Sequence, residues 1–372
     1  MNNLKRTLAI ILCLLLALTC LAGCHQKGEI AVKISDYEFT SGYYACALVF
    51  ADGEARTLVE EQLSEDGDLP EEIKYWNYKV EDTDYVEWVQ SRTLKILKEL
   101  AALKTACAKA GIELSEDEIA EVKSNADFMW DGISEYYANY GYAYSDYSDL
   151  LMPNGVSYET YEQYMIDSYL YDKYFEYLYG KGGEKEIPAE KITTQLTDNY
   201  VLVNIIQVDY SSLTDEEKTN KLNQLTAYKD AISSGAKSFE EVYLEYNGIS
   251  AEDHTHEEAE EGETLPQDQH ATVLGAEDTD YTSDYYESAK AMEVGAVTVA
   301  TLEDDAGIAL IVKKDIAADP YYLEQFDSTL RTEIAGEEFE EFVSEAGAKL
   351  ECEVNTSSTK QFKVKKIVYP ED

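Results

Sequence analysis

Histidine is rare in this chain, and three of its histidines stand in one region. The chain of 372 residues has four, and the stretch "EDHTHEEAEEGE" places His254 and His256 among acidic residues, with His270 further on. Two histidines two positions apart on an extended chain can share a metal ion such as zinc. The same stretch is highly charged and poor in apolar residues, which is typical of a solvated, mobile loop. We interpret it as such a loop, with metal binding at His254 and His256 as the alternative.

An asparagine interrupts an otherwise apolar segment. The stretch "VLVNIIQVDY", residues 201–210, has the composition of a buried β-strand. Side chains alternate between the two faces of a strand, so Asn204 points to the same face as Leu202, Ile206 and Val208. A buried amide without hydrogen-bond partners costs about 1–3 kcal/mol. The asparagine therefore indicates either a polar site or a neighbouring loop that satisfies the amide.

Other familiar catalytic patterns are missing from the sequence. It contains no recognisable Ser/His/Asp set, no glycine-rich phosphate loop and no paired-cysteine metal motif. A hydrolase or a nucleotide-dependent enzyme therefore has no support, and we expect no cofactor.

The first residues have the pattern of an export signal. A basic start precedes an apolar run over residues 8–18, and the ending "LAGC" places a cysteine at position 24. This ending matches the bacterial lipobox, which implies cleavage before Cys24 and a diacylglyceryl group on its thiol. The alternative is an uncleaved membrane span, but the run is short for the about 20 residues that a span needs. We expect residues 1–23 to be removed and lipidated Cys24 to hold the protein at the outer side of the cell membrane, with residues 24–28 as a tether.

The composition is strongly acidic. The chain has 75 acidic and 30 basic residues and a net charge of −45, and removal of a leader with two basic and no acidic residues makes it −47. Because nucleic-acid phosphates would be repelled, we exclude nucleic acid as a partner. The charge favours solubility, with attraction of cationic clients or divalent ions as the alternative. The three cysteines beyond Cys24, at 46, 107 and 352, form no disulfide framework, although one pair could form.

The residues after the tether are predicted to be mostly helical. Helices are expected over 84–111 and 157–180, and a capping box of Ser115 and Glu118 begins another. Tyrosines crowd the last two of these helices. Because tyrosine buries its ring while its hydroxyl stays wet, they indicate either half-buried helix faces or a client-binding surface. These tyrosines are Tyr136, Tyr137, Tyr140, Tyr158, Tyr161, Tyr164, Tyr169, Tyr171, Tyr174 and Tyr177.

Strands and helices then alternate. The strand at 201–210 is followed by a helix over 214–233, by a second helix that Ser238 caps, and by a polar stretch over 248–282. A short helix and two strands around "EDDAG" complete an α+β unit of about 115 residues. A long helix follows, and "KQFKVKKIVYPED" is predicted to form a strand and a tail.

This layout resembles the extracytoplasmic foldases typified by PrsA and SurA. "ITTQLTDNYVLVNIIQV" resembles the entry helix and first strand of their parvulin-type peptidyl-prolyl isomerase domain, and "YYESAKAMEVGAVTVATLEDDAGIALIVKK" resembles its closing segment. The resemblance implies an α+β fold in which a discontinuous, mostly helical SurA-like chaperone domain carries an inserted parvulin-like α/β domain. The implied segments are 29–186 and 317–350 for the chaperone domain, 187–198 for a linker helix, 199–316 for the parvulin-like domain, and 351–372 for the C-terminal strand and tail.

The chain departs from the family pattern where the chemistry is expected. The resemblance places family histidines at Asn204 in the first strand and at Ala309 in the last. It places the substrate-binding pocket at Tyr281, Tyr285 and Met292, together with Asn204. Asn204 is then either the polar replacement of a lost histidine or an asparagine that a nearby loop satisfies.

These departures shape the expected function. Prolyl isomerisation has a barrier of about 20 kcal/mol and requires only a site that favours the twisted amide. Because both histidine positions are replaced, the resemblance implies a weak or inactive isomerase. We therefore expect a membrane-anchored folding factor that binds unfolded or proline-containing secreted polypeptides. The alternatives are a scaffolding or ligand-binding surface lipoprotein and a fully active isomerase with a rearranged site.

Overall fold

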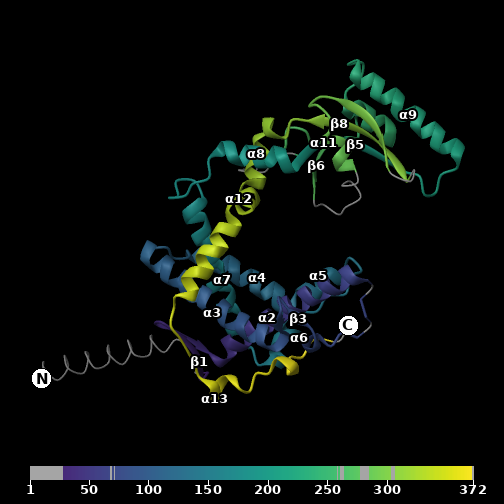
Figure 1. Cartoon of the computed structure of the whole chain (residues 1–372). Coiled ribbons are helices and arrows are strands. Elements are labelled where there is room, and N and C mark those ends of the chain that lie inside the picture. Colours follow the sequence, from purple (N-terminus) through teal and green to yellow (C-terminus); the bar gives the residue numbers. More distant parts are fainter. Residues whose placement is uncertain are drawn as a thin grey trace, which may run out of the picture. The chain divides into compact units, whose positions relative to one another are not determined.

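The protein forms two compact units, seen here in a computed structural model that describes residues 28–67, 69–70, 72–257, 259, 264–276, 285–302 and 306–370. Unit 1 contains the residues up to Leu178 and those from Glu337 on, and unit 2 is Tyr179–Gly336 (Figure 1). Unit 1 is thus discontinuous and unit 2 is inserted into it. This is the predicted fold class, an α+β protein with an insertion in a mostly helical domain. The predicted domain boundaries, including 199–316, stay predictions.

Unit 1 is a helical unit with a three-stranded antiparallel sheet in the order β2-β1-β9. The long helix α12 (Pro320–Ala348) begins in unit 2 and ends in unit 1. The other elements of unit 1 are β1 (Ile30–Ile34), β2 (Tyr37–Thr40), α2 (Ser41–Asp66), η1 (Tyr75–Asn77), β3 (Lys79–Val80), β4 (Thr83–Asp84), α3 (Tyr85–Ala110), α4 (Glu116–Asp131), α5 (Ile133–Ala138), α6 (Tyr147–Leu151), η2 (Met152–Asn154), α7 (Tyr158–Tyr179), β9 (Cys352–Val354), α13 (Thr356–Thr359) and η6 (Val364–Lys366).

Local sequence signals explain the ends of these helices. The Ser115 hydroxyl accepts a hydrogen bond from the Glu118 N–H, and the Glu118 carboxylate accepts one from the Ser115 N–H, so the predicted capping box is confirmed. Gly111 ends α3 with φ +71°, a left-handed conformation in which glycine has no steric penalty. Helix α2 contributes to two hydrophobic clusters of unit 1, one shared with α3 and β1 and the other with α4 and α7.

Unit 2 is built on a four-stranded antiparallel sheet in the order β6-β5-β8-β7. Its sheet follows from apolar, β-branched runs such as "VLVNIIQV" and "GIALIVKK". Its elements are α8 (Ala189–Asn199), β5 (Tyr200–Asp209), α9 (Asp215–Ser233), α10 (Phe239–Asn247), β6 (Ala271–Gly275), α11 (Tyr286–Lys290), β7 (Val297–Thr301), β8 (Gly307–Lys314) and η5 (Ile316–Ala318), before α12 begins.

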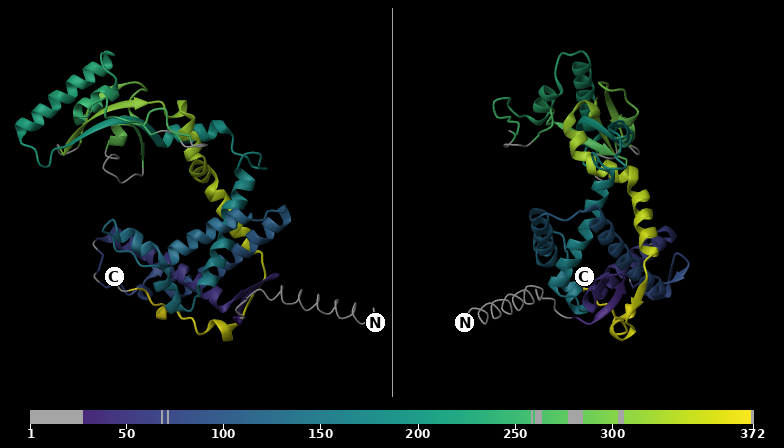
Figure 2. Two further views of the ribbon diagram at one scale, coloured as in Figure 1. Left: turned by 180° about the vertical axis from the view of Figure 1, so that it is seen from behind. Right: turned by 90° about the vertical axis from the view of Figure 1, so that its left-hand side faces the viewer.

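Helices cover both faces of this sheet. Residues of α9 and α10 pack with Ile206 and Leu310 on one face, and Figure 2 shows α9 lying along the sheet. Residues around α11 pack with Val203 and Ile311 on the other face. Both central strands are therefore buried on two sides, which makes unit 2 a three-layer arrangement around β5 and β8.

Two elements differ from the sequence prediction. Strand β6 lies inside the stretch 248–282, which was predicted as a polar loop. Near the C-terminus the strand is Cys352–Val354, which pairs with β1, and the segment predicted as a strand contains the 3-10 helix Val364–Lys366 instead. The signal segment and Cys24 lie outside the described residues. Within the described part of the chain, no helix has the length and apolar character to cross a bilayer.

Candidate functional site

An exposed cluster of aromatic side chains lies on unit 1, where α4 leads into α5 and the turn after it. Phe128 is 41% exposed, and four tyrosines beyond it are 48–65% exposed. Ring centroids of Phe128 and Tyr136 lie 5.7 Å apart, and those of Tyr136 and Tyr140 lie 5.3 Å apart. Tyr137 stacks on Tyr144 with centroids 4.3 Å apart. We call this surface the aromatic patch, and its residues are Phe128, Tyr136, Tyr137, Tyr140, Tyr142 and Tyr144.

The turn that carries the aromatic patch is closed at its base. Ser134 donates to the Asp146 carboxylate twice, from its N–H at 3.0 Å and from its hydroxyl at 2.7 Å. Gly141, with φ +82°, allows the chain to reverse between these two residues. The tyrosines are therefore held by the backbone of a closed turn while their rings stay exposed to solvent.

The crowded tyrosines of the sequence thus divide into two groups. Tyr161 is fully buried and Tyr164 is half-buried, both in the cluster around Trp130. Tyr136 and Tyr140 are exposed. Both interpretations of the tyrosines therefore fit, the half-buried helix face for α7 and an accessible surface for the segment around α5.

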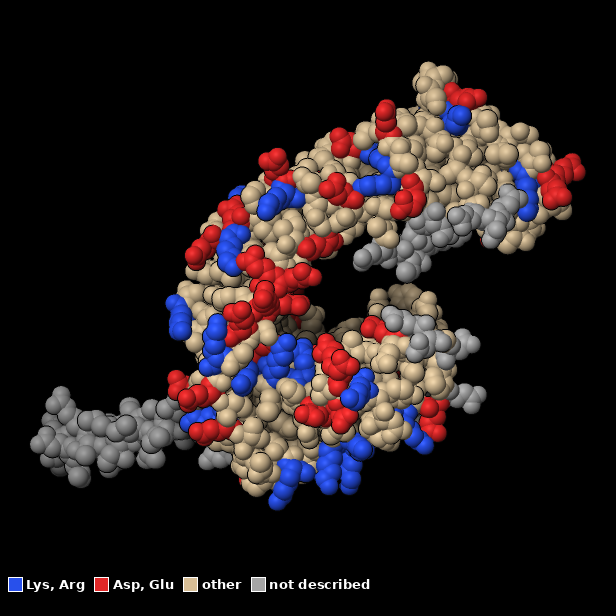
Figure 3. All heavy atoms as spheres, in the orientation of Figure 1, with Lys and Arg blue, Asp and Glu red and all other residues tan. Residues whose placement is uncertain are grey.

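A charged groove is the second feature of unit 1. Its cavity, of about 800 Å³, is lined by α2, α3, α7 and the C-terminal part of α12. Arg92 donates to Glu54 at 2.5 and 3.0 Å and to Glu99 at 3.1 Å. Figure 3 shows acidic side chains gathered along α12 beside basic side chains over α3. Such a groove suits an extended segment with basic and apolar side chains. Its acidic residues on α12 are Glu337, Glu340 and Glu341.

Asn204 lies in the centre of the sheet of unit 2. Its side chain is fully buried, and neither amide atom has a hydrogen-bond partner among the described residues. Asp268 lies beside Asn204, and its burial opposes ionisation. Lys314 donates to the Asp268 carboxylate at 2.8 Å and nevertheless holds the pKa of Asp268 below its usual value. The Asn204 amide makes a smaller contribution in the same direction. The loop that was expected to satisfy Asn204 therefore comes near it without a hydrogen bond of normal geometry.

The other predicted pocket residues lie on the opposite face of the sheet. Ala309 and Tyr285 are fully buried in the cluster near α11, and Met292 packs against that cluster. The Tyr285 hydroxyl lies 3.4 Å from the place that a Cβ on Gly307 would take. As placed, Tyr285 is a core residue, so contact with a client requires this face to open. Tyr281 lies outside the described residues.

The two replaced histidine positions do not come together. Across β5 and β8, Asn204 pairs with Val312 and Ala309 pairs with Gln207. Paired residues point to the same face and successive residues to opposite faces. Asn204 therefore lies on the α9–α10 face, and Ala309 lies on the α11 face. Side chains at these positions are separated by the sheet, so the structure does not assemble the site that the resemblance placed there.

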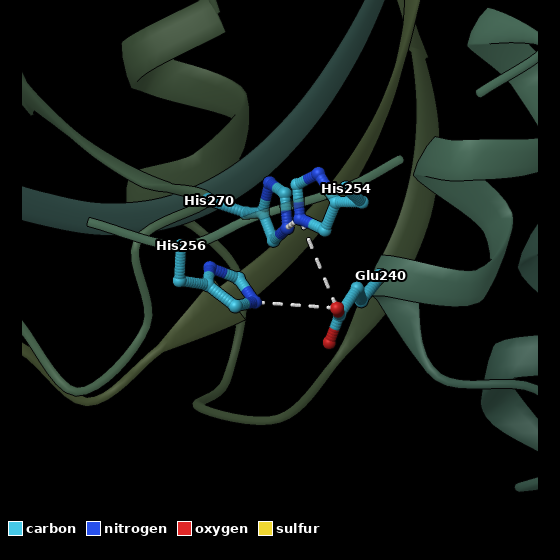
Figure 4. A group of neighbouring side chains, drawn as sticks. All are labelled: Glu240, His254, His256 and His270. Atoms are coloured by element: carbon cyan, nitrogen blue, oxygen red, sulfur yellow. Dashed lines mark hydrogen bonds and ion pairs between the residues drawn. The ribbon is translucent and has the colours of Figure 1, made fainter. Parts of the chain in front are cut away.

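The histidines converge instead. Figure 4 shows His254, His256 and His270 around the carboxylate of Glu240. Nε2 of His254 lies 3.2 Å from Nε2 of His270, and Nε2 of His256 lies 3.2 Å from a carboxylate oxygen of Glu240. Burial, and next the neighbouring His254, lower the pKa of His270. The group combines three imidazoles with one carboxylate, which are ligands for transition metals.

Sequence reasoning found only part of this group. His254 and His256 were identified from their spacing, whereas His270 stood outside the pair and Glu240 was one acid among many. Glu240 lies on α10, and its partners follow 14 to 30 residues later. Nothing in the sequence marked Glu240 as a ligand. Because histidine is rare in this chain, His270 could have been added to the candidate ligands His254 and His256.

No family model matches the chain, and no curated protein matches it. Solved structures that are similar include the foldase protein PrsA from Streptococcus pneumoniae str. Canada MDR_19A, with 18% sequence identity, a TM-score of 0.36, and coverage of 76% of this chain and 92% of that chain. The foldase protein PrsA from Lactococcus lactis has 12% identity, a TM-score of 0.36, and coverage of 90% and 100%. PrsA from Bacillus subtilis has 13% identity, a TM-score of 0.25, and coverage of 73% and 89%. These are the foldases that the sequence resembles.

Proposed function

We propose that the protein is a lipid-anchored, extracytoplasmic folding factor that holds unfolded secreted polypeptides, with weak or absent prolyl isomerase activity. The observation that carries this proposal is the aromatic patch of unit 1. Four of its tyrosine side chains are 48–65% exposed on a turn that hydrogen bonds close. The anchor in this proposal is a lipid on Cys24, and residues 24–28 are the tether.

An exposed aromatic surface suits unfolded clients for physical reasons. Unfolded chains display apolar side chains that folded proteins hide, and aromatic rings bind them without demanding one sequence. The tyrosine hydroxyls keep the surface compatible with water while no client is bound. The charged groove of unit 1, with its acidic residues on α12, favours client segments that also carry basic residues. A net charge of −45 acts in the same direction and repels nucleic acid.

For the inserted unit 2, we propose binding of client segments rather than catalysis of their prolyl isomerisation. Neither β5 nor β8 contains a histidine, and the two positions where the family has one point to opposite faces of the sheet. Catalysis of prolyl rotation requires polar groups that surround one amide and favour its twisted form. We therefore assign proline-containing client segments to unit 2 as ligands, with little acceleration of their isomerisation.

Aggregation of an unrelated, chemically unfolded protein tests the proposal. The chain from residue 26 keeps every described residue and should suppress light scattering after dilution from denaturant. The variant Tyr136→Ser/Tyr140→Ser/Tyr144→Ser should need about tenfold more protein for the same suppression, because it loses aromatic anchors together worth about 1.4 kcal/mol. The matched control replaces three exposed apolar residues of unit 2, as Leu222→Ser/Ile249→Ser/Val294→Ser, and should suppress like the parent.

The same assay separates the rival functions. A scaffolding lipoprotein has no reason to suppress aggregation of an unrelated protein, so absence of suppression by the parent favours that alternative. Equal losses in the patch variant and its control would mean that the aromatic patch is not the binding surface. For the anchor, Cys24→Ser in the full chain should move the protein from the membrane fraction to the soluble fraction.

A further inference from the structure

We propose that Glu240, His254, His256 and His270 form a zinc-binding site in unit 2. The candidate ligand atoms of these four residues all lie within 4.8 Å of one another. The chain has only four histidines in 372 residues, and three of them belong to this group. Nothing in the proposed chaperone function requires this convergence, so it needs an explanation of its own.

The distances fit a small tetrahedral ion. With metal–ligand bonds of about 2.0–2.1 Å, tetrahedral zinc ligands lie about 3.3 Å from one another. Nε2 of His254 and Nε2 of His270 are 3.2 Å apart, and Nε2 of His256 lies 3.2 Å from Oε1 of Glu240. Nε2 of His254 lies 3.8 Å from the same oxygen. Two of these spacings are thus close to those of a zinc coordination shell, and the third is about half an ångström longer.

The ligands come from three separate places in the chain and are held there. Glu240 lies in the first turn of α10, and His270 immediately precedes β6. The His270 ring packs on Tyr243 with centroids 4.6 Å apart and is stacked at 5.0 Å with the ring of His254. Figure 4 shows the rings of His254 and His270 side by side and the ring of His256 turned toward Glu240. Packing thus orients the rings of His254 and His270 before an ion arrives.

The ligand types favour zinc among the common cations. Three imidazoles and one carboxylate match the nitrogen and oxygen ligands of tetrahedral zinc. Calcium and magnesium require mostly oxygen ligands and higher coordination numbers. Copper(II) binds such ligands strongly but prefers a tetragonal arrangement. The side chains of Glu240 and His256 are 47% and 44% exposed, which leaves a route for the ion from solvent.

A zinc ion here would have a structural role. It would tie the start of α10 to the residues before β6. Strand β6 is the edge strand that pairs with β5, so the ion would also fix that edge of the sheet. Because the ligands are brought together only in the folded unit, zinc binding would add to the free energy of folding.

Calorimetric titration of the chelator-treated chain from residue 26 with zinc chloride tests this site. A purification tag without histidine is needed. We expect one zinc ion per chain, a loss of at least about tenfold in affinity for Glu240→Gln, and no measurable binding for His254→Gln/His270→Gln, since a tetrahedral site loses two of four ligands. The matched control is Glu252→Gln, which removes the same charge from an exposed residue two positions before His254. This control should bind zinc like the parent.

Cobalt(II) gives a second measurement. Its visible absorption is intense in tetrahedral sites and weak in octahedral ones, so the parent should show the tetrahedral spectrum and the double histidine variant should not. Circular dichroism verifies that the variants are folded without metal. Absence of zinc binding by the parent overturns the proposal, and so does binding that the ligand variants and Glu252→Gln weaken equally. The aromatic-patch variant should bind zinc normally, so failure here leaves the chaperone proposal standing.

Discussion

The aromatic patch of unit 1 and the predicted pocket of unit 2 use tyrosine in opposite ways. Tyr140 is 65% exposed on a closed turn, whereas Tyr285 is fully buried between α11 and the sheet. Tyr140 was a candidate for client binding because tyrosines crowd its part of the chain, and Tyr285 because the family resemblance places the substrate-binding pocket there. A ring contributes to binding only where a client can reach it. The aromatic patch is therefore accessible as it stands, whereas client binding at Tyr285 requires the α11 face of unit 2 to open.

The first prediction tests this contrast through stability. Tyr285→Ala should destabilise unit 2 by about 3–5 kcal/mol, because it leaves a cavity in a closed core, whereas Tyr140→Ala should change stability by less than about 0.5 kcal/mol. All three tryptophans, Trp76, Trp88 and Trp130, lie in unit 1, so their fluorescence reports that unit alone. Urea denaturation followed by circular dichroism should therefore show an earlier transition in Tyr285→Ala, while the tryptophan transition stays unchanged.

The reverse result would break the contrast. If Tyr285→Ala unfolds like the parent and instead loses client binding, Tyr285 belongs to an accessible pocket and the resemblance-based interpretation is right. If Tyr140→Ala is strongly destabilised, the aromatic patch is part of a core that clients cannot use.

The second prediction concerns the buried amide. Asn204→Leu should raise the free energy of unfolding of unit 2 by about 1–2 kcal/mol, because it replaces an unpartnered polar group by an apolar one of similar shape. Asn204→Asp keeps the shape, adds a charge and should destabilise the same unit. Urea denaturation followed by circular dichroism measures both. A less stable Asn204→Leu would mean that the amide has a partner in solution, for which Asp268 is the nearest candidate.

Much of the fold could be predicted because its signals are local. The capping box of Ser115 and Glu118, the glycine that ends α3 and the apolar run of β5 each depend on a few adjacent residues. The insertion of one unit into the other was implied by the family resemblance. Such features require no knowledge of which residues meet in space.

The rest depends on contacts between distant residues. Strand β6 is five residues long inside a polar stretch and is stabilised by pairing with β5, so its own sequence does not identify it. Likewise Glu240 becomes a candidate ligand only when α10 packs beside the residues before β6. The relation between Asn204 and Ala309 depends on the register of two strands that lie far apart in the chain, and an alignment of motifs does not contain this register.

The third prediction is a comparison in which no change is expected. Restoring both family histidines, as Asn204→His/Ala309→His, should leave prolyl isomerase activity at the level of the parent. The imidazoles would point to opposite faces of the sheet, one toward α9 and α10 and the other into the cluster near α11, so they could not act on the same amide. A proline tetrapeptide assay measures both proteins, with circular dichroism to verify that the variant folds. A gain in activity would show that β5 and β8 can pair in a register that brings the two positions to one face. Clear activity in the parent would show that the inserted unit catalyses prolyl rotation without histidines, and the isomerase interpretation would then take precedence over the chaperone one.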